Sequence, residues 1–95
     1  MLTIVFIKRH MQAGAEKEFF ALIKKLRSNA MGHDGYISGE TLSRYDRPGE
    51  YLVISTWQSV EDWQAWEKDS ERQEISRMID SLLGSKADYQ VYVYG

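Results

Sequence analysis

Two segments of the chain are apolar on both of their alternating faces, and this is the strongest constraint on the fold. Residues 2–8 read Leu-Thr-Ile-Val-Phe-Ile-Lys, and residues 50–57 read Glu-Tyr-Leu-Val-Ile-Ser-Thr-Trp. Because successive side chains of a strand point to opposite faces, each segment carries large apolar groups on both sides. A strand of this kind is normally covered on both sides. We therefore expect both strands to be packed between two layers.

The first half of the chain adds a helix and a hairpin. Apolar residues recur at helical spacing over residues 15–31 (Phe19, Ile23, Leu26 and Ala30, widened by Leu22), and Gly32 follows as a stop. A second strand is predicted over residues 35–44, weakened by Gly39. The sequence Asp46-Arg47-Pro48-Gly49 then favours a turn, because proline and glycine set the backbone angles that a turn needs. The short turn predicts that the second and third strands form an antiparallel hairpin.

Two helical segments and a last strand follow. Ser59 precedes two acidic residues and is expected to cap a short helix. Val60, Trp63 and Trp66 share one face of that helix. The sequence Ser70-Glu71-Arg72-Gln73 matches a capping box and predicts a new helix capped by Ser70. An amphipathic stripe then runs to Gly84, and residues 87–94 alternate as the fourth strand.

The predicted order is β-α-β-β-α-β, with the second helical segment broken in two. This is the ferredoxin-like split βαβ pattern, an α+β fold with a four-stranded antiparallel sheet and its helices on one face. At 95 residues with no linker, we expect one domain over residues 1–95.

The uncovered face of this sheet predicts a homodimer. It carries large side chains drawn from Leu2, Ile4, Phe6, Leu52, Ile54, Tyr92 and Tyr94, or from the alternate residues of the same strands. The sequence does not decide between these two sets. Soluble monomers rarely expose apolar patches above a few hundred Å². We therefore expect two sheets to pack face to face in an α+β barrel. The alternative is a monomer whose open face is more polar.

Composition excludes several classes of function. Twelve basic and 14 acidic side chains give a net charge of −2, without the excess of basic residues that a nucleic-acid binder needs. With no cysteine, the chain has no disulfide, thiolate metal site or cysteine nucleophile. No apolar run approaches the roughly 18 residues of a membrane span. The N-terminus lacks the features of a signal peptide, so we expect a cytoplasmic protein.

Two stretches resemble the antibiotic biosynthesis monooxygenase (ABM) domain family. One is Gly35-Tyr36-Ile37-Ser38-Gly39-Glu40-Thr41-Leu42, and the other is Tyr51-Leu52-Val53-Ile54-Ser55-Thr56-Trp57 with Ser59, Asp62-Trp63, Trp66 and Ser70 after it. The likeness runs over nearly the whole chain. It implies a dimeric α+β barrel with a small hydrophobic pocket between sheet and helices in each subunit. Family members include oxygenases that attack aromatic polyketides or quinols without metal or flavin, and others that degrade haem.

The haem-degrading members use an asparagine on the first strand, a tryptophan on the short helix and an axial histidine ten residues later. The corresponding positions here are Ile7, Trp66 and Ser76. Two of the three residues differ, including the iron ligand, and a hydroxyl is a poor substitute for imidazole. The resemblance therefore implies a protein without a cofactor, and haem binding or degradation is the third hypothesis for its function.

An oxygenase without a cofactor must deprotonate an electron-rich aromatic substrate and hold the anion away from water. Trp63 and Trp66 could supply stacking walls, and Arg9, Arg72 or Arg77 could hold a phenolate. Core packing for the tryptophans and solvent exposure for the arginines are the alternative interpretations.

The two histidines have no metal-binding spacing. His10 lies at the end of the first strand and His33 lies in a turn. His10 could still act as a base at the mouth of a pocket.

The sequence thus predicts a cofactor-independent monooxygenase that acts on a small aromatic or quinol-like molecule. The candidate pocket residues are Trp66, Trp63, Ile7, Arg9, Ser76 and Arg72. The alternative is a non-catalytic dimeric module that binds a small apolar ligand.

Overall fold

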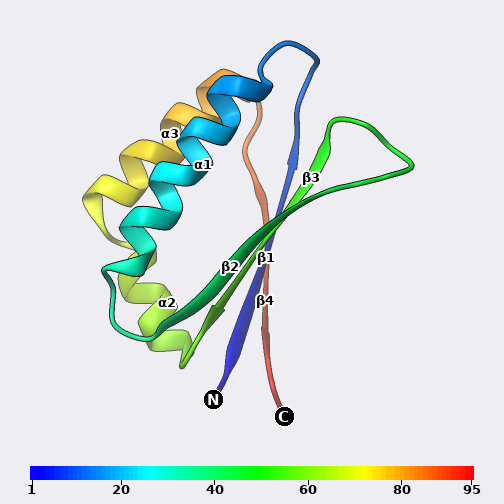
Figure 1. Cartoon of the computed structure of the whole chain (residues 1–95). Helices are drawn as coiled ribbons and strands as arrows, with labels where there is room; N and C mark the ends of the chain where they lie inside the picture. The colour runs from blue at the N-terminus through cyan, green and yellow to red at the C-terminus, as the bar shows by residue number, and fades with distance from the viewer.

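The computed structural model describes residues 1–95 and contains four strands and three helices (Figure 1). In chain order they are β1 (Thr3–His10), α1 (Glu16–Met31), β2 (Tyr36–Ser43), β3 (Glu50–Trp57), α2 (Val60–Glu67), α3 (Ser70–Leu83) and β4 (Asp88–Val93). The ferredoxin-like βαββαβ prediction is confirmed, with the second helical segment split into α2 and α3. Every predicted strand is present, with bounds that shift by two residues at most.

The four strands form one antiparallel sheet in the order β2-β3-β1-β4. The three helices lie together on one face of this sheet (Figure 1). The two central strands are β1 and β3, which are the two segments whose sequences are apolar on both faces. No helix combines the length and the apolar character that crossing a membrane requires.

The register decides which residues face the helices. In β1 these are the buried Thr3, Val5, Ile7 and Arg9, which pair with Trp57, Ser55, Val53 and Tyr51 of β3. The alternate residues therefore form the open face, which settles the choice that the sequence left undecided. Its large side chains are Ile4, Phe6, Leu42, Leu52, Ile54 and Tyr92. Phe6 and Tyr92 meet edge to face there, with ring centroids 5.4 Å apart.

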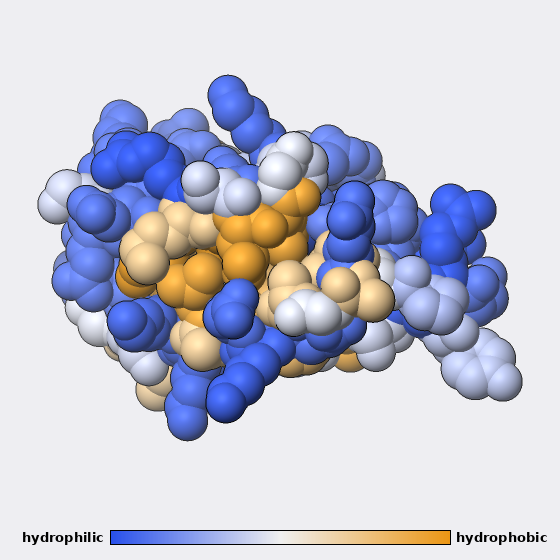
Figure 2. All heavy atoms as spheres, turned by 90° about the horizontal axis from the view of Figure 1, so that it is seen from above, coloured by the Kyte–Doolittle hydropathy of each residue, from blue (hydrophilic) through white to orange (hydrophobic).

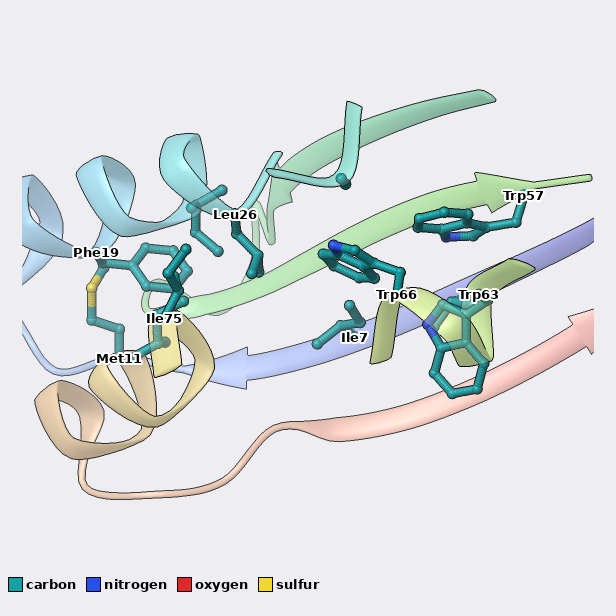
Figure 3. Close-up of a cluster of buried hydrophobic side chains, with 12 residues drawn as sticks. Ile7, Met11, Phe19, Leu26, Trp57, Trp63, Trp66 and Ile75 are labelled. Carbon is teal, nitrogen blue, oxygen red and sulfur yellow. The ribbon is translucent and has the colours of Figure 1, made fainter. Parts of the chain in front are cut away.

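The core lies between the helices and the sheet. It contains twelve buried apolar residues, among them Phe19 and Leu26 of α1, Trp57 of β3 and Ile79 of α3. Viewed from the end of the molecule where β1 leads into α1, apolar side chains fill the space between the layers and hydrophilic ones surround them (Figure 2). The core is continuous along the molecule, and the three tryptophans gather at one end of it (Figure 3).

The helix ends confirm one predicted cap and correct another. Ser59 Oγ accepts a hydrogen bond from the backbone N–H of Asp62 at 3.1 Å, as the sequence predicts. For α3 the predicted helix start at Ser70 is confirmed, but Ser70 is not the cap that the capping-box pattern implies. The cap is Asp69, whose carboxylate accepts from the backbone N–H of Arg72 at 2.9 Å. Gly84 ends α3 with a left-handed backbone (φ +71°), as expected for a glycine stop.

Candidate active site

A small apolar recess lies between α1 and the sheet, next to the Trp66 ring of α2. Its lining consists of Ile7, Ile23, Leu26, Arg27, Ala30, Tyr36, Gly39, Val53, Ser55 and Trp66. The cavity volume of the recess is about 30 Å³, and all of its empty space, counted out to open solvent, is about 370 Å³. A cavity of this volume holds two or three water molecules at the ~10–15 Å³ that each needs. A larger ligand must therefore extend beyond the cavity towards solvent.

Trp66 forms one wall of the recess and is held in a fixed orientation. Its ring is buried and lies 5.3 Å from the Trp57 ring, centroid to centroid. Figure 3 shows it between Trp57 on one side and Leu26 and Ile7 on the other. The indole N–H donates a 2.8 Å hydrogen bond to Asn29 Oδ1 on α1. Packing and this bond together leave the aromatic face little freedom to turn.

The mouth of the recess carries its only charged group. Arg27 is the one exposed residue of the ten that line the recess, so its guanidinium marks the opening. Its Nη2 donates to Thr41 Oγ1 at 3.2 Å. Beside it lies Tyr36, which is half-buried, and burial raises the pKa of its phenol. The charge of Arg27 opposes this rise in pKa and that of Glu40 adds to it.

The absence of a side chain at Gly39 makes room for the Tyr36 hydroxyl. A Cβ at this position would lie 2.7 Å from that hydroxyl and 3.7 Å from Arg27 Nε. The Tyr36 hydroxyl therefore packs onto the glycine, and the Arg27 side chain lies close to the same point at the mouth. Deeper in, Ser55 Oγ accepts a 3.1 Å hydrogen bond from Trp57 Nε1 and keeps its own proton to donate.

A second polar cluster lies under α3 and does not line the recess. Arg9 is 4% exposed, and its Nη1 contacts Asp80 Oδ1 at 2.8 Å while its Nη2 reaches Ser76 Oγ at 3.5 Å. Arg72 is 6% exposed, and its Nη2 donates to the Tyr89 hydroxyl at 2.8 Å.

Arg72 is a buried cation between two aromatic rings. Its guanidinium carbon lies 5.1 Å from the Trp66 ring centroid and 5.5 Å from that of Tyr89. No carboxylate forms an ion pair with it, and its Nε has no hydrogen-bond partner. The expectation that arginines of the amphipathic helices lie in solvent is wrong for Arg72, because aromatic faces replace water around its side chain. It holds for Arg77, which is exposed.

The structure thus separates the six residues that the sequence proposed. Ile7 and Trp66 line the recess. Arg9, Ser76 and Arg72 belong to the cluster under α3. Trp63 is buried on α2 outside the recess, and its Nε1 has no partner.

Neither histidine lines the recess. His10 is exposed at the end of β1, and His33 Nε2 lies 3.4 Å from Asp69 Oδ1. No group of three or more histidine, aspartate or glutamate side chains is close enough to hold a metal ion.

Sequence reasoning missed Arg27, Tyr36 and Ser55 as polar groups of the recess. They come from α1, β2 and β3, and no local spacing connects them. One signal was available, since a glycine inside a predicted strand often marks a close approach of a ligand or another chain segment. Gly39 is such a glycine, and it lies next to two of the three missed residues.

The fold recurs in solved structures of low sequence identity. A conserved protein from Methanosarcina mazei superimposes with a TM-score of 0.91 at 16% identity, over 100% of this chain and 94% of that one. SnoaB, a cofactor-independent oxygenase from Streptomyces nogalater, superimposes with a TM-score of 0.84 at 15% identity, over 100% of this chain and 95% of SnoaB. Rv0793 from Mycobacterium tuberculosis superimposes with a TM-score of 0.86 at 15% identity, over 100% of this chain and 96% of Rv0793. No curated protein matches the sequence significantly.

The sequence itself matches one protein family. The profile described as antibiotic biosynthesis monooxygenase covers residues 1–77, which is most of the chain and includes every strand except β4. The matched part includes β1 and β3 at the centre of the sheet, α1, α2 with Trp66 and the first half of α3. The chain therefore belongs to the antibiotic biosynthesis monooxygenase family.

Proposed function

We propose that the protein is a cofactor-independent monooxygenase that acts on a small aromatic or quinol-like substrate. The observation that carries the proposal is the apolar recess walled by Trp66, in a chain that belongs to a monooxygenase family. The likeness in fold to SnoaB, itself a cofactor-independent oxygenase, supports the same reaction class. The position matched to the axial haem ligand is Ser76, which contacts Arg9 and does not line the recess.

The reaction can be written with its atoms balanced for a substrate that carries an activated ring CH₂ group. Loss of one proton gives a carbanion, which transfers an electron to O₂ and then combines with the resulting superoxide. Protonation of the peroxide and loss of water leave a carbonyl, so that CH₂ and O₂ become C=O and H₂O. The chain contributes by excluding water, since the recess has an apolar interior, and by stacking the ring on Trp66.

The size of the recess indicates a small substrate. Its cavity volume of about 30 Å³ is well below the roughly 150 Å³ of an apolar cavity that takes up benzene. A single ring stacked on Trp66 would therefore extend out of the cavity towards Arg27 at the mouth.

We further propose that two copies of the chain pair through the open face of the sheet. Leu42 and Tyr92 on this face are about half exposed, and no element of the chain covers them. Burying this face against a second copy would give an interface with an apolar centre, of the kind that stable homodimers bury over more than about 1,200 Å².

Sedimentation at micromolar protein concentration tests the dimer. We expect a species of twice 11.1 kDa, and we expect Phe6→Lys to convert it to a monomer. Met78→Lys is the matched control, because Met78 is an exposed apolar residue on the helix side. A folded, non-aggregating 11.1 kDa species in the unmodified protein would contradict the proposal.

Oxygen consumption tests the enzyme. The protein is mixed with a panel of hydroquinones and anthrones, and uptake is followed with an oxygen electrode. We expect uptake with at least one substrate and its loss in Trp66→Ala, because the ring loses its stacking surface. Tyr45→Phe, on a fully exposed side chain of the β2–β3 turn, serves as the control. The same uptake in Trp66→Ala as in the unmodified protein would contradict the assignment of the recess.

One feature of the recess favours a second function, a non-catalytic module that binds a small apolar ligand. No histidine or carboxylate lines the recess, so it holds no residue of the type that most often acts as a general base. A rise in melting temperature with a ligand that is not turned over would support this function. Substrate-dependent oxygen uptake would reject it.

A further inference from the structure

The mouth of the recess presents a positive charge without a partner. Arg27 is the only charged residue of the lining, and no carboxylate forms an ion pair with its guanidinium. Its single side-chain hydrogen bond goes to the neutral hydroxyl of Thr41. A guanidinium has five N–H donors in a planar fork, so most of them remain free at the opening.

The Tyr36 hydroxyl adds a neutral donor at the same point. Burial raises the pKa of Tyr36, with a smaller contribution from Glu40, so its phenol keeps its proton at neutral pH. Glu40 pairs with Ile54 in the register and lies on the open face of the sheet, away from the recess. The hydroxyl fills the place that a Cβ at Gly39 would take, 2.7 Å from it, and Arg27 Nε lies 3.7 Å from the same point, so the two groups lie close together on the lining of the recess. Two donors that line the same recess can bind one strong acceptor at its mouth.

A second unpaired cation lies behind the Trp66 wall. The guanidinium of Arg72 is buried 5.1 Å from the centre of the Trp66 ring, with no carboxylate in ion-pair contact. Charges act over longer distances in an apolar interior than in water, because screening is weak there. Arg72 from α3 therefore adds a second positive charge behind the Trp66 ring, to that of Arg27 at the mouth.

We infer that the recess selects an aromatic ligand in its ionised form, with the phenolate oxygen between the Arg27 guanidinium and the Tyr36 hydroxyl and the ring against Trp66. The inference rests on the proposed function, since it takes the recess as the place where an aromatic ligand binds. It assigns the binding of the anion to Arg27 and Tyr36, two residues that the sequence analysis did not propose, in place of Arg9, Arg72 or Arg77. No covalent step is involved.

Two matched probes test the charge preference without turnover. The first is 4-nitrophenol, which ionises near neutral pH and whose phenolate is yellow. The second is 4-nitroanisole, its methyl ether, which has the same ring and cannot ionise. Binding is followed by quenching of tryptophan fluorescence, and the protonation state of bound nitrophenol by its visible absorbance. We expect the phenolate to bind at least tenfold more tightly than the ether, and the pKa of the bound probe to fall by about one unit.

Variants assign the preference to residues. We expect Arg27→Gln to weaken phenolate binding about tenfold or more, to leave the ether within about twofold, and to abolish the shift in the probe's pKa. Arg27→Lys keeps the charge without the fork and should recover part of the loss. Tyr36→Phe should weaken phenolate binding by about threefold to tenfold. Arg77→Gln removes an exposed arginine of α3 as the matched control. Arg27 is exposed, so these variants should fold normally, which circular dichroism can verify.

The outcomes separate this inference from the proposed function. Equal affinity for the two probes, or an Arg27→Gln variant that binds both as before, overturns the inference while oxygen uptake can still support the enzyme. Selective phenolate binding without oxygen uptake by any substrate supports the inference and removes the oxygenase. If neither probe binds up to millimolar concentration, the assignment of an aromatic anion to the recess is wrong.

Discussion

Removal of the Asn29 side chain tests whether one hydrogen bond fixes the wall of the recess. Asn29 Oδ1 accepts the indole N–H of Trp66 at 2.8 Å, and Trp66 is only 3% exposed. Asn29→Ala leaves this donor buried without an acceptor.

The expected cost follows from two opposing contributions. A buried donor without a partner costs about 1–3 kcal/mol. Asn29 lies in the last two turns of α1, where alanine is the better helix former by up to about 0.7 kcal/mol. The net loss of unfolding free energy should therefore be about 1–2 kcal/mol. For a domain of this size each kcal/mol shifts the melting temperature by about 4–8 °C.

A double-mutant cycle isolates the bond from other effects of the substitution. Trp66→Phe keeps an aromatic ring but has no N–H donor, so Asn29→Ala in that background should cost nothing or stabilise slightly. The four proteins are unfolded with urea and followed by circular dichroism, at one fixed chain concentration because pairing of chains would raise apparent stability. We expect a coupling energy of about 1–3 kcal/mol.

Additive effects in this cycle would refute the reasoning. If the coupling stays within the roughly 0.3–0.5 kcal/mol that independent sites show, the Trp66–Asn29 bond does not stabilise the wall. The ring orientation would then be set by packing against Trp57 and Leu26 alone.

Three further predictions concern backbone and caps. Gly35→Ala should lower the unfolding free energy clearly more than Gly84→Ala. Both glycines have positive φ, where a side chain costs about 1–2 kcal/mol, but only at Gly35 would the new Cβ overlap the Asp62 carboxylate. Equal losses of unfolding free energy in urea would contradict this. Ser59→Ala should lower the unfolding free energy by about 0.5–2 kcal/mol through loss of the α2 cap, and a loss below this range would show that the cap is not needed. The backbone N–H at the start of α3 lowers the pKa of the Asp69 carboxyl below its ordinary value of 3.8. The stability that ionised Asp69 contributes is therefore complete above that pH and is lost as the pH falls through the lowered pKa. The advantage of the unmodified protein over Asp69→Asn in urea midpoint should therefore shrink in acid, and a constant difference would exclude this titration.

The fold was predictable because its strongest signals are local. The hairpin turn, the alternation of β1 and β3 and the spacing of Phe19 and Ile23 each determine an element without reference to the rest of the chain. The cap of α3 was not predictable in the same way. Asp69 and Ser70 are both good capping residues, and only the actual backbone shows which of them reaches the N–H of Arg72.

The recess was predictable only in part, because it is made by tertiary packing. Trp66 and Ile7 were candidates through the family resemblance, and both line it. The arginine at its mouth is Arg27, on the helix farthest in sequence from the tryptophans, and not Arg9 or Arg72. Nothing in the spacing of α1 distinguishes Arg27 from a solvent-exposed arginine, since its role depends on how α1 crosses β2.

The two central strands serve both faces of the sheet, and this links the recess to the proposed dimer contact. Along β1, Phe6 points to the open face and the next residue, Ile7, points into the recess. Along β3, Ile54 on the open face lies between Val53 and Ser55, which both line the recess. A partner sheet packed on the open face would therefore restrain the backbone that shapes the recess from behind. The proposed function and the proposed dimer together account for apolar side chains on both faces of these strands. On the helix side they line the candidate site. On the other side they form the face that the chain's own helices do not cover.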